Sequence, residues 1–255
     1  MRSAVIWTGA SRYDGSPLVA ILTGMDGSSG NPKTGTGDAA MAQLYILRAD
    51  IDPNSAMQGH TSGNCGNCKH QSTYDAATAK WTVGSCYVQV FFGPGSAYRA
   101  WVNGSHPVLT PSQAANVCRE RGIPIRIGAY GDGALMDPTV LRSIVRGIGQ
   151  TGWTGYTHAW REQPHARRSL MASVDTPDEA RAAWSKGWRT FRTRLESEPL
   201  MPGEIACPAS AEMGYRTVCA TCRLCDGARP GDTRRNIAII AHGSTAKKYI
   251  AIRAV

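Results

Sequence analysis

Four of the eight cysteines of this 255-residue chain gather in one stretch near its C-terminal end. Cys219, Cys222 and Cys225 follow a C-x2-C-x2-C spacing, and Cys207 lies upstream before a proline. Each two-residue step lets a tight turn aim two thiolates at one centre, and four sulfurs suit tetrahedral zinc or a four-iron four-sulfur cluster. His242 is an alternative ligand, although a ring held by a backbone carbonyl is the simpler interpretation. The spacing predicts a metal site, which either closes the C-terminal loop or takes part in chemistry.

A second set of thiols lies earlier in the chain. Cys65 and Cys68 form another C-x2-C pair, Cys86 follows, and His60 and His70 are near in sequence. Three thiols with an imidazole such as that of His60 would make a closed metal site, whereas three thiols alone would leave a position open for substrate or water. The alternative is that these are ordinary loop cysteines.

Polar side chains follow several expected strands. Residues 124–133 form one such strand and end in Asp132, and a strand through Val174 is followed by Asp175. Ligands bind at the carboxyl ends of strands in α/β proteins, so we expect both carboxylates at one face. One would act as nucleophile or electrostatic stabiliser and the other as general acid or base, unless Asp175 only caps a helix. The expected substrate-binding residues at these ends are Tyr130, Gly131, Tyr156, His158 and Trp160.

The pattern along the chain alternates strands with helices. Proline follows a capping residue at 110–111, 137–138 and 176–177, and apolar residues at helical spacing follow each pair. Short β-rich runs at 153–160 and 236–243 complete the alternation. The sequence therefore predicts a single α/β domain over residues 1–255, as a (β/α) barrel-like or incomplete barrel with cysteine-rich metal-binding loops. Within it we expect an N-terminal strand and hairpin region (1–60), a cysteine-containing insertion (61–90) and a four-cysteine metal loop (205–235).

Composition bounds the partners and the compartment. The chain carries 28 Lys and Arg against 19 Asp and Glu, a formal net charge of +9, and 42% hydrophobic residues. Such a balance favours an anionic partner, nucleic acid first. No apolar run is long enough for a membrane span or a secretory leader, so we expect a cytoplasmic protein without membrane contact. In a reducing compartment, cysteines serve more often as ligands, catalytic groups or core residues than as disulfides.

The motifs together resemble a known set of proteins. The segments "CGNC…CYV", "IRIGAYGD", "TGYTHAWR", "LMASVDTPDEA" and "CPAS…C-x2-C-x2-C…IAIIAHG" look like those of small cysteine-rich phage and prophage proteins. The set is more distantly similar to tRNA-guanine transglycosylases and their phage relatives that insert 7-deazaguanines into DNA. Radical S-adenosylmethionine barrels are a weaker second resemblance, because the N-terminal C-x3-C-x2-C motif is absent.

The first resemblance implies a base-exchange enzyme, a pentosyl transferase that replaces guanine in DNA, or less readily in tRNA, with a small 7-deazapurine base. Asp175 would attack the glycosidic carbon, Asp132 would move a proton, and zinc would sit on Cys219, Cys222 and Cys225 with His242, in a phage-infected or prophage-bearing host. The family spacing is C-x-C-x2-C, so this ligand set departs from it. The alternatives are an iron–sulfur enzyme of the radical type and a zinc-stabilised nucleic-acid-binding protein without catalysis.

Overall fold

The computed structural model describes residues 1–28 and 34–253. The Gly-rich segment 24–38 is therefore described only in part, because residues 29–33 lie outside the described residues. The strands are β1 (Ser3–Ala10), β2 (Pro17–Thr23), β3 (Ala42–Arg48), β4 (Thr73–Asp75), β5 (Lys80–Thr82), β6 (Ile125–Tyr130), β7 (Trp153–Thr157), β8 (Met171–Val174), β9 (Thr190–Arg194), β10 (Glu204–Ala206) and β11 (Asn236–Ile240). The α-helices are α1 (Pro53–Ala56), α2 (Ser62–Cys65), α3 (Gly93–Val102), α4 (Pro111–Glu120), α5 (Pro138–Ile148), α6 (Pro177–Ser185), α7 (Cys219–Cys222) and α8 (Ala246–Arg253), and five short 3-10 turns, η1 (Gly37–Ala39), η2 (Gly133–Leu135), η3 (Gly149–Thr151), η4 (Pro164–Arg168) and η5 (Ala211–Met213), connect them.

Nine of these strands form one sheet in the order β1-β2-β3-β6-β7-β8-β9-β11-β10. β1, β2 and β3 pair antiparallel, which confirms the expected N-terminal hairpin. From β3 to β10 every neighbouring pair is parallel. Within the described residues β1 and β10 remain edge strands, so the sheet is open. The α/β class is confirmed, and the barrel is incomplete.

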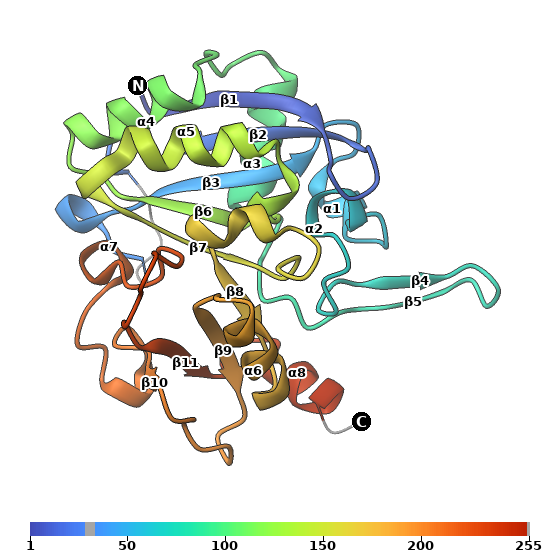
Figure 1. The fold of residues 1–255 in the computed structure, drawn as a ribbon. Coiled ribbons are helices and arrows are strands. Elements are labelled where there is room, and N and C mark those ends of the chain that lie inside the picture. The colour runs from blue at the N-terminus through green and yellow to red at the C-terminus, as the bar shows by residue number, and fades with distance from the viewer. Residues whose placement is uncertain (29–33, 254–255) are drawn as a thin grey trace.

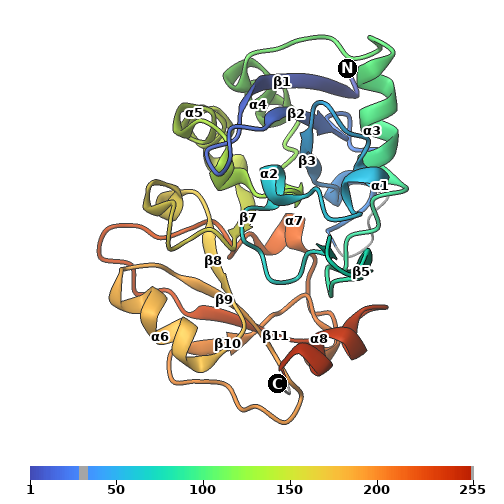
Figure 2. The same cartoon turned by 90° about the vertical axis from the view of Figure 1, so that its right-hand side faces the viewer.

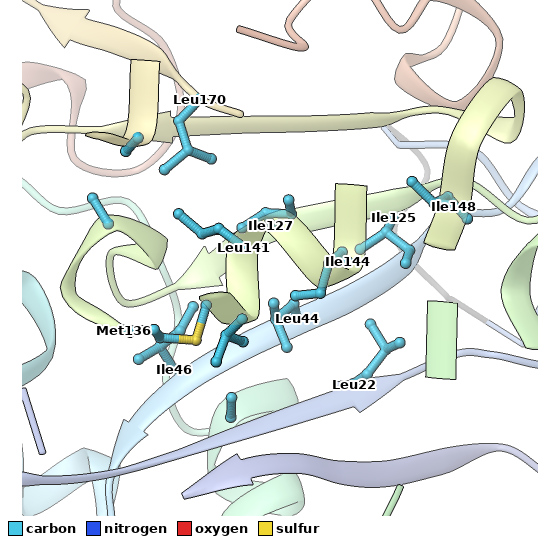
Figure 3. Close-up of a cluster of buried hydrophobic side chains, with 14 of the residues drawn as sticks. Leu22, Leu44, Ile46, Ile125, Ile127, Met136, Leu141, Ile144, Ile148 and Leu170 are labelled. Carbon is cyan, nitrogen blue, oxygen red and sulfur yellow. The ribbon is translucent and has the colours of Figure 1, made fainter. Parts of the chain in front are cut away.

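Helices cover the N-terminal half of the sheet on both faces. α4 and α5 lie on one side of β1–β3, and α3 lies on the other (Figure 1; Figure 2). The predicted N-terminal caps of α4 and α5 both form. Thr110 makes a capping box with Gln113 at the start of α4, and Asp137 accepts from the backbone N–H of Thr139 at the start of α5. Side chains of α5 such as Leu141 and Ile144 pack on the β3 and β6 residues beneath them (Figure 3). Each such buried side chain contributes about 1.5–3 kcal/mol to folding.

The C-terminal half carries the remaining parallel strands and the cysteine loop. α6 begins at Pro177 with Thr176 as its cap, as predicted, and follows β8. The segment 207–235 connects β10 to β11. The last described helix, α8, lies beside β9 and β11 (Figure 2). The cysteine-containing insertion at 61–90 includes the hairpin β4–β5, which projects away from the body of the protein (Figure 1). Among the described residues, no helix has the length and apolar character of a membrane-spanning segment.

Candidate functional site

Three consecutive parallel strands end in ionisable side chains. Asp132 follows β6, His158 follows β7 and Asp175 follows β8, and His70 reaches them from the insertion. We call these four residues the strand-end cluster. Parallel strands place their carboxyl ends at one edge, so the strand order β6-β7-β8 is what gathers them. The predicted convergence of Asp132, His158 and Asp175 on one face is present.

The carboxylate of Asp132 is buried and fully hydrogen-bonded. Its Oδ1 accepts from the backbone N–H of Ala134 (2.9 Å), which caps the turn that follows β6. Its Oδ2 accepts from the hydroxyl of Thr157 (2.9 Å) and from the backbone N–H groups of His158 (3.0 Å) and Ala159 (3.3 Å). Burial raises the pKa of Asp132, and these donors together with the charge of His158 act against that rise.

The carboxylate of Asp175 is held by three side chains and is 2% exposed. Its Oδ2 lies 2.8 Å from Nζ of Lys69 and 3.0 Å from Nε2 of His70, and its Oδ1 accepts from the hydroxyl of Tyr249 at 3.1 Å. Burial alone would raise the pKa of Asp175. The hydrogen bonds and charges of His70 and Lys69 outweigh it, so the pKa lies well below its ordinary value.

His70 connects this carboxylate to the rest of the cluster. Its Nδ1 lies 2.6 Å from Oγ of Ser85, so both ring nitrogens are engaged. Its ring stands edge-on to that of His158, with centroids 5.3 Å apart, and stacks on Tyr249 at 5.5 Å. Of the four cluster residues, His158 is the most open to solvent, because the other three are each buried.

Three thiols border the strand-end cluster. Burial raises the pKa of Cys65 well above its ordinary value, and the neighbouring Cys68, Cys86 and Asp132 add to this rise. Burial, with the charges of Asp132 and Asp175, raises the pKa of Cys68 to about 12. Backbone hydrogen bonds join Cys68 to Cys65 (3.3 Å) and Cys86 to the carbonyl of His70 (2.9 Å), so the three cysteines lie in one folded segment, and a metal shared by them stays a prediction. His60, the expected fourth member, is exposed, and its carbonyl accepts from Arg48. No contact within the described residues joins its ring to the thiols.

The four cysteines of the C-terminal segment line a single small cavity of about 20 Å³. We call it the four-thiol cavity; its lining includes Cys207, Cys219, Cys222, Cys225 and Tyr156 of β7. None of the eight cysteines, which all lie in described residues, forms a disulfide. His242 is not among the lining residues; its Nδ1 donates to the carbonyl of Ile240 at 2.7 Å. The carbonyl-held histidine is thus the arrangement found.

Backbone hydrogen bonds bring the thiols of this cavity together. The carbonyl of Cys225 accepts from Gly155 of β7 (2.9 Å), and the N–H of Cys207 donates to Ala238 of β11 (2.8 Å). Arg189, 4% exposed, donates to the carbonyls of Leu224 (2.7 Å), Gly227 (3.2 Å) and Arg235 (2.8 Å). The loop is therefore anchored to the sheet on both sides of its cysteines.

Burial raises the pKa of the Cys225 thiol, and the hydroxyl of Tyr156 acts against that rise. Within residues 1–28 and 34–253, no three His, Cys, Asp or Glu side chains are already grouped as ligands of one metal ion. The four cysteines line one cavity, but their sulfurs are not arranged as the ligands of a single ion.

Three of the predicted substrate-binding residues are instead part of the core or the backbone turn. Tyr130 is 3% exposed and packs beside Val5 and Leu47. Gly131 has a φ of +77°, and a Cβ there would lie 2.1 Å from the carbonyl oxygen of Ile46, so glycine is required by the backbone. Trp160 is 2% exposed in the core, with the guanidinium of Arg161 4.0 Å above its ring. Its ring is therefore covered and not open for stacking on a base.

Several residues of both sites were not predicted from the sequence. Lys69 and Ser85 flank the predicted cysteines, so their positions beside C-x2-C and Cys86 were a usable signal. Tyr249 lies in α8 and reaches Asp175 from more than 70 residues away, and no local pattern marks it. Comparison of the chain with protein-family models, with curated proteins and with solved structures finds no match.

Proposed function

We propose that the protein is an enzyme that modifies a base in nucleic acid, and that the strand-end cluster is its reaction centre. The observation that carries the proposal is the convergence of Asp132, His158 and Asp175 at the ends of three adjacent parallel strands, beside three thiols. A net charge of +9 supports an anionic polymer as substrate. DNA is the preferred polymer and tRNA the alternative.

Exposed aromatic rings in the insertion that carries His70 support a nucleobase substrate. Tyr74 and Trp81 face each other across the β4–β5 hairpin and are 52% and 44% exposed, and Tyr87, which follows Cys86, is 60% exposed. Every base has a flat π-face, and stacking on an aromatic side chain stabilises it by about 1–3 kcal/mol. Cations also border the cluster: the side chains of Lys69 and Arg161 are 40% and 46% exposed.

The burial of the two aspartates favours orienting roles for them. A carboxylate nucleophile needs an open oxygen, whereas both oxygens of Asp175 are engaged by Lys69, His70 and Tyr249. In our proposal Asp175 fixes the ring of His70 and Asp132 fixes the backbone at His158. His158, the more open imidazole, then moves the proton on the base.

The three thiols fit a metal in their chemistry. Burial raises the pKa of Cys65 and Cys86, the neighbouring thiol of Cys68 adds to both rises, and a bound cation would favour the thiolates. Three thiolates would leave one coordination position for a water or a substrate atom, which such a metal would polarise. The metal of this set would be zinc or, as the alternative, the iron of an iron–sulfur cluster.

Nucleoside analysis tests the function. Single- and double-stranded oligonucleotides are incubated with the protein and with 7-deazaguanine bases and are then digested to nucleosides. The nucleoside masses are measured by mass spectrometry, and the release of labelled guanine is measured in parallel. We expect a base change that is lost in His158→Gln and retained in Cys118→Ala, which alters a core cysteine of α4. A base change that survives His158→Gln would contradict the proposed roles, and no base change on any substrate would contradict the function.

A further inference from the structure

The strand-end cluster is closed on one side by the last described helix. Tyr249 of α8 places its hydroxyl 3.1 Å from Oδ1 of Asp175 and 2.6 Å from the carbonyl oxygen of Thr193 in β9. A tyrosine hydroxyl has one proton, so the two acceptors share it. The ring of Tyr249 stacks on that of His70, with the ring centroids 5.5 Å apart. α8 thus covers one oxygen of Asp175 and one face of His70.

A second residue of α8 holds the helix in the same place. The guanidinium of Arg253 donates to the backbone carbonyl of Asp175 and to the hydroxyl of Tyr249 (3.1 Å). It also forms an ion pair with Glu198, in the segment that follows β9. Tyr249 and Arg253 lie four residues apart and therefore share one face of the helix. This face is the one that contacts the cluster.

The remaining side chains of α8 contribute little to its attachment. Of its eight described residues, only Tyr249 is buried, and Ile250 and Ile252 are 48% and 41% exposed. α4 and α5 differ, because their apolar side chains belong to the main core. An element with few buried apolar contacts opens locally at a lower free-energy cost than unfolding of the whole protein. The polar contacts of Tyr249 and Arg253 therefore determine whether α8 is docked.

We propose that α8 is a cover over the strand-end cluster, docked by Tyr249 and Arg253, and that its release admits substrate to Asp175 and His70. Release frees Oδ1 of Asp175 from the hydroxyl of Tyr249 and uncovers one face of the His70 ring. Lys69 and His70 contact the other oxygen, Oδ2, so the carboxylate keeps both of these partners when α8 leaves. The admission of substrate rests on the proposed function, whereas the docking and release of α8 do not.

Hydrogen–deuterium exchange of the full chain tests the release. In wild type the backbone amides of α8 should exchange faster than those of α4, because α8 opens without global unfolding. Tyr249→Phe keeps the ring and removes the hydroxyl, and Arg253→Met removes the ion pair and the contact with Asp175. Each change should speed exchange in α8 about tenfold, the effect of losing one or two hydrogen bonds, and leave exchange in α4 unchanged. Lys248→Gln, at an exposed position of α8, should match wild type.

Hydroxyl-radical footprinting tests what α8 covers. Tyr249→Ala removes the ring that stacks on His70, so oxidation of the His70 side chain should rise several-fold, and it should change less in Tyr249→Phe. Unchanged exchange in α4 shows that the alanine variant is folded. Where base change is measured, Arg253→Met should raise kcat/KM by the same factor as it speeds exchange in α8, because both depend on the open fraction.

The outcomes separate the cover from the reaction. Amides of α8 that exchange as slowly as those of α4 in wild type and in both docking variants would overturn the cover. Unchanged oxidation of His70 in Tyr249→Ala would do the same. Faster exchange in Arg253→Met with an unaltered kcat/KM would overturn the admission of substrate by release. Absence of base change in wild type contradicts the proposed function, and the exchange and footprinting results then decide the cover by themselves.

Discussion

The two cysteine sets of this protein differ most in how their charges are balanced. At the strand-end cluster the carboxylate of Asp175 lies within 3.0 Å of Nζ of Lys69 and Nε2 of His70, so its charge is compensated within the polypeptide. At the four-thiol cavity four thiols line one small space, and burial raises the pKa of the Cys225 thiol. A balanced set of buried charges can be explained by folding alone. Four thiols around one small space instead have the ligand chemistry of a metal site.

The largest effect is expected from removing the metal that the C-x2-C-x2-C spacing predicts at the four-thiol cavity. A ligand present at about 1,000 times its Kd stabilises the native state by about 4 kcal/mol, which for a chain of this length is about 8–16 °C in Tm. A chelator should lower the Tm by this amount in wild type, as followed by scanning fluorimetry. It should have little effect in Cys222→Ser, whose own Tm is already low. An unchanged wild-type Tm in the presence of the chelator would show that no metal at the four-thiol cavity stabilises the fold.

A second prediction concerns the balanced pair at the strand ends. Asp175→Asn leaves Lys69 and His70 without their common carboxylate, and breaking a buried ion pair costs about 3–5 kcal/mol. Because the Lys69 side chain is 40% exposed, we expect the lower end, about 3 kcal/mol, in urea unfolding. Asp178→Asn, at a side chain that is 94% exposed, should change stability by less than about 0.5 kcal/mol. Equal losses in the two variants would show that the pairing at Asp175 contributes nothing.

The two aspartates of the cluster should respond oppositely to pH. The folded pKa of Asp175 is lowered, so its contribution is complete above the unfolded value of about 4 and is lost as the pH falls through the folded pKa. The folded pKa of Asp132 is raised, so its contribution declines as the pH rises from about 4 through the folded value. Unfolding free energies measured from pH 2 to 7 should therefore fall less steeply on acidification in Asp175→Asn, and more steeply in Asp132→Asn, than in wild type. The reverse order would show that these charge environments are misassigned.

The smallest effect on stability is expected on the β4–β5 hairpin. Trp81→Ala removes an exposed ring and should change the free energy of unfolding by less than about 0.5 kcal/mol. The same change should weaken binding of a fluorescent single-stranded oligonucleotide about tenfold, the effect of losing one stacked base. Trp184→Phe, whose indole donates to Thr190 inside the fold, should show the opposite pattern, with lower stability and unchanged binding. Unaltered oligonucleotide binding by Trp81→Ala would argue against the hairpin as a stacking surface.

Local sequence signals predicted much of the fold. Capping residues with proline at the first turn located α4, α5 and α6, because a cap and a proline act on the same few backbone groups wherever they occur. Short β-rich runs located β6, β7, β8 and β11, whereas β10 was not predicted. Strand order was not predictable in this way, since it depends on pairing between distant segments, and the open edge at β10 follows from that pairing.

The candidate site was predicted by position but not by environment. The carboxyl ends of strands correctly placed Asp132, His158 and Asp175 together. Their hydrogen-bond partners come from elsewhere: Tyr249 from α8 and His70 from the insertion. Burial of Trp160 likewise depends on packing that spans the sheet. No sequence pattern distinguishes an open carboxylate from one that its neighbours enclose.

The most direct test of the account is nucleoside mass analysis with His158→Gln protein that retains its full zinc content. We predict that wild type changes the mass of a base in an oligonucleotide and that this variant, folded and metal-loaded, does not. Conversion by the variant at the wild-type rate, or the absence of conversion by wild type, would contradict a division of roles between a reaction centre at the strand ends and a metal in the four-thiol cavity.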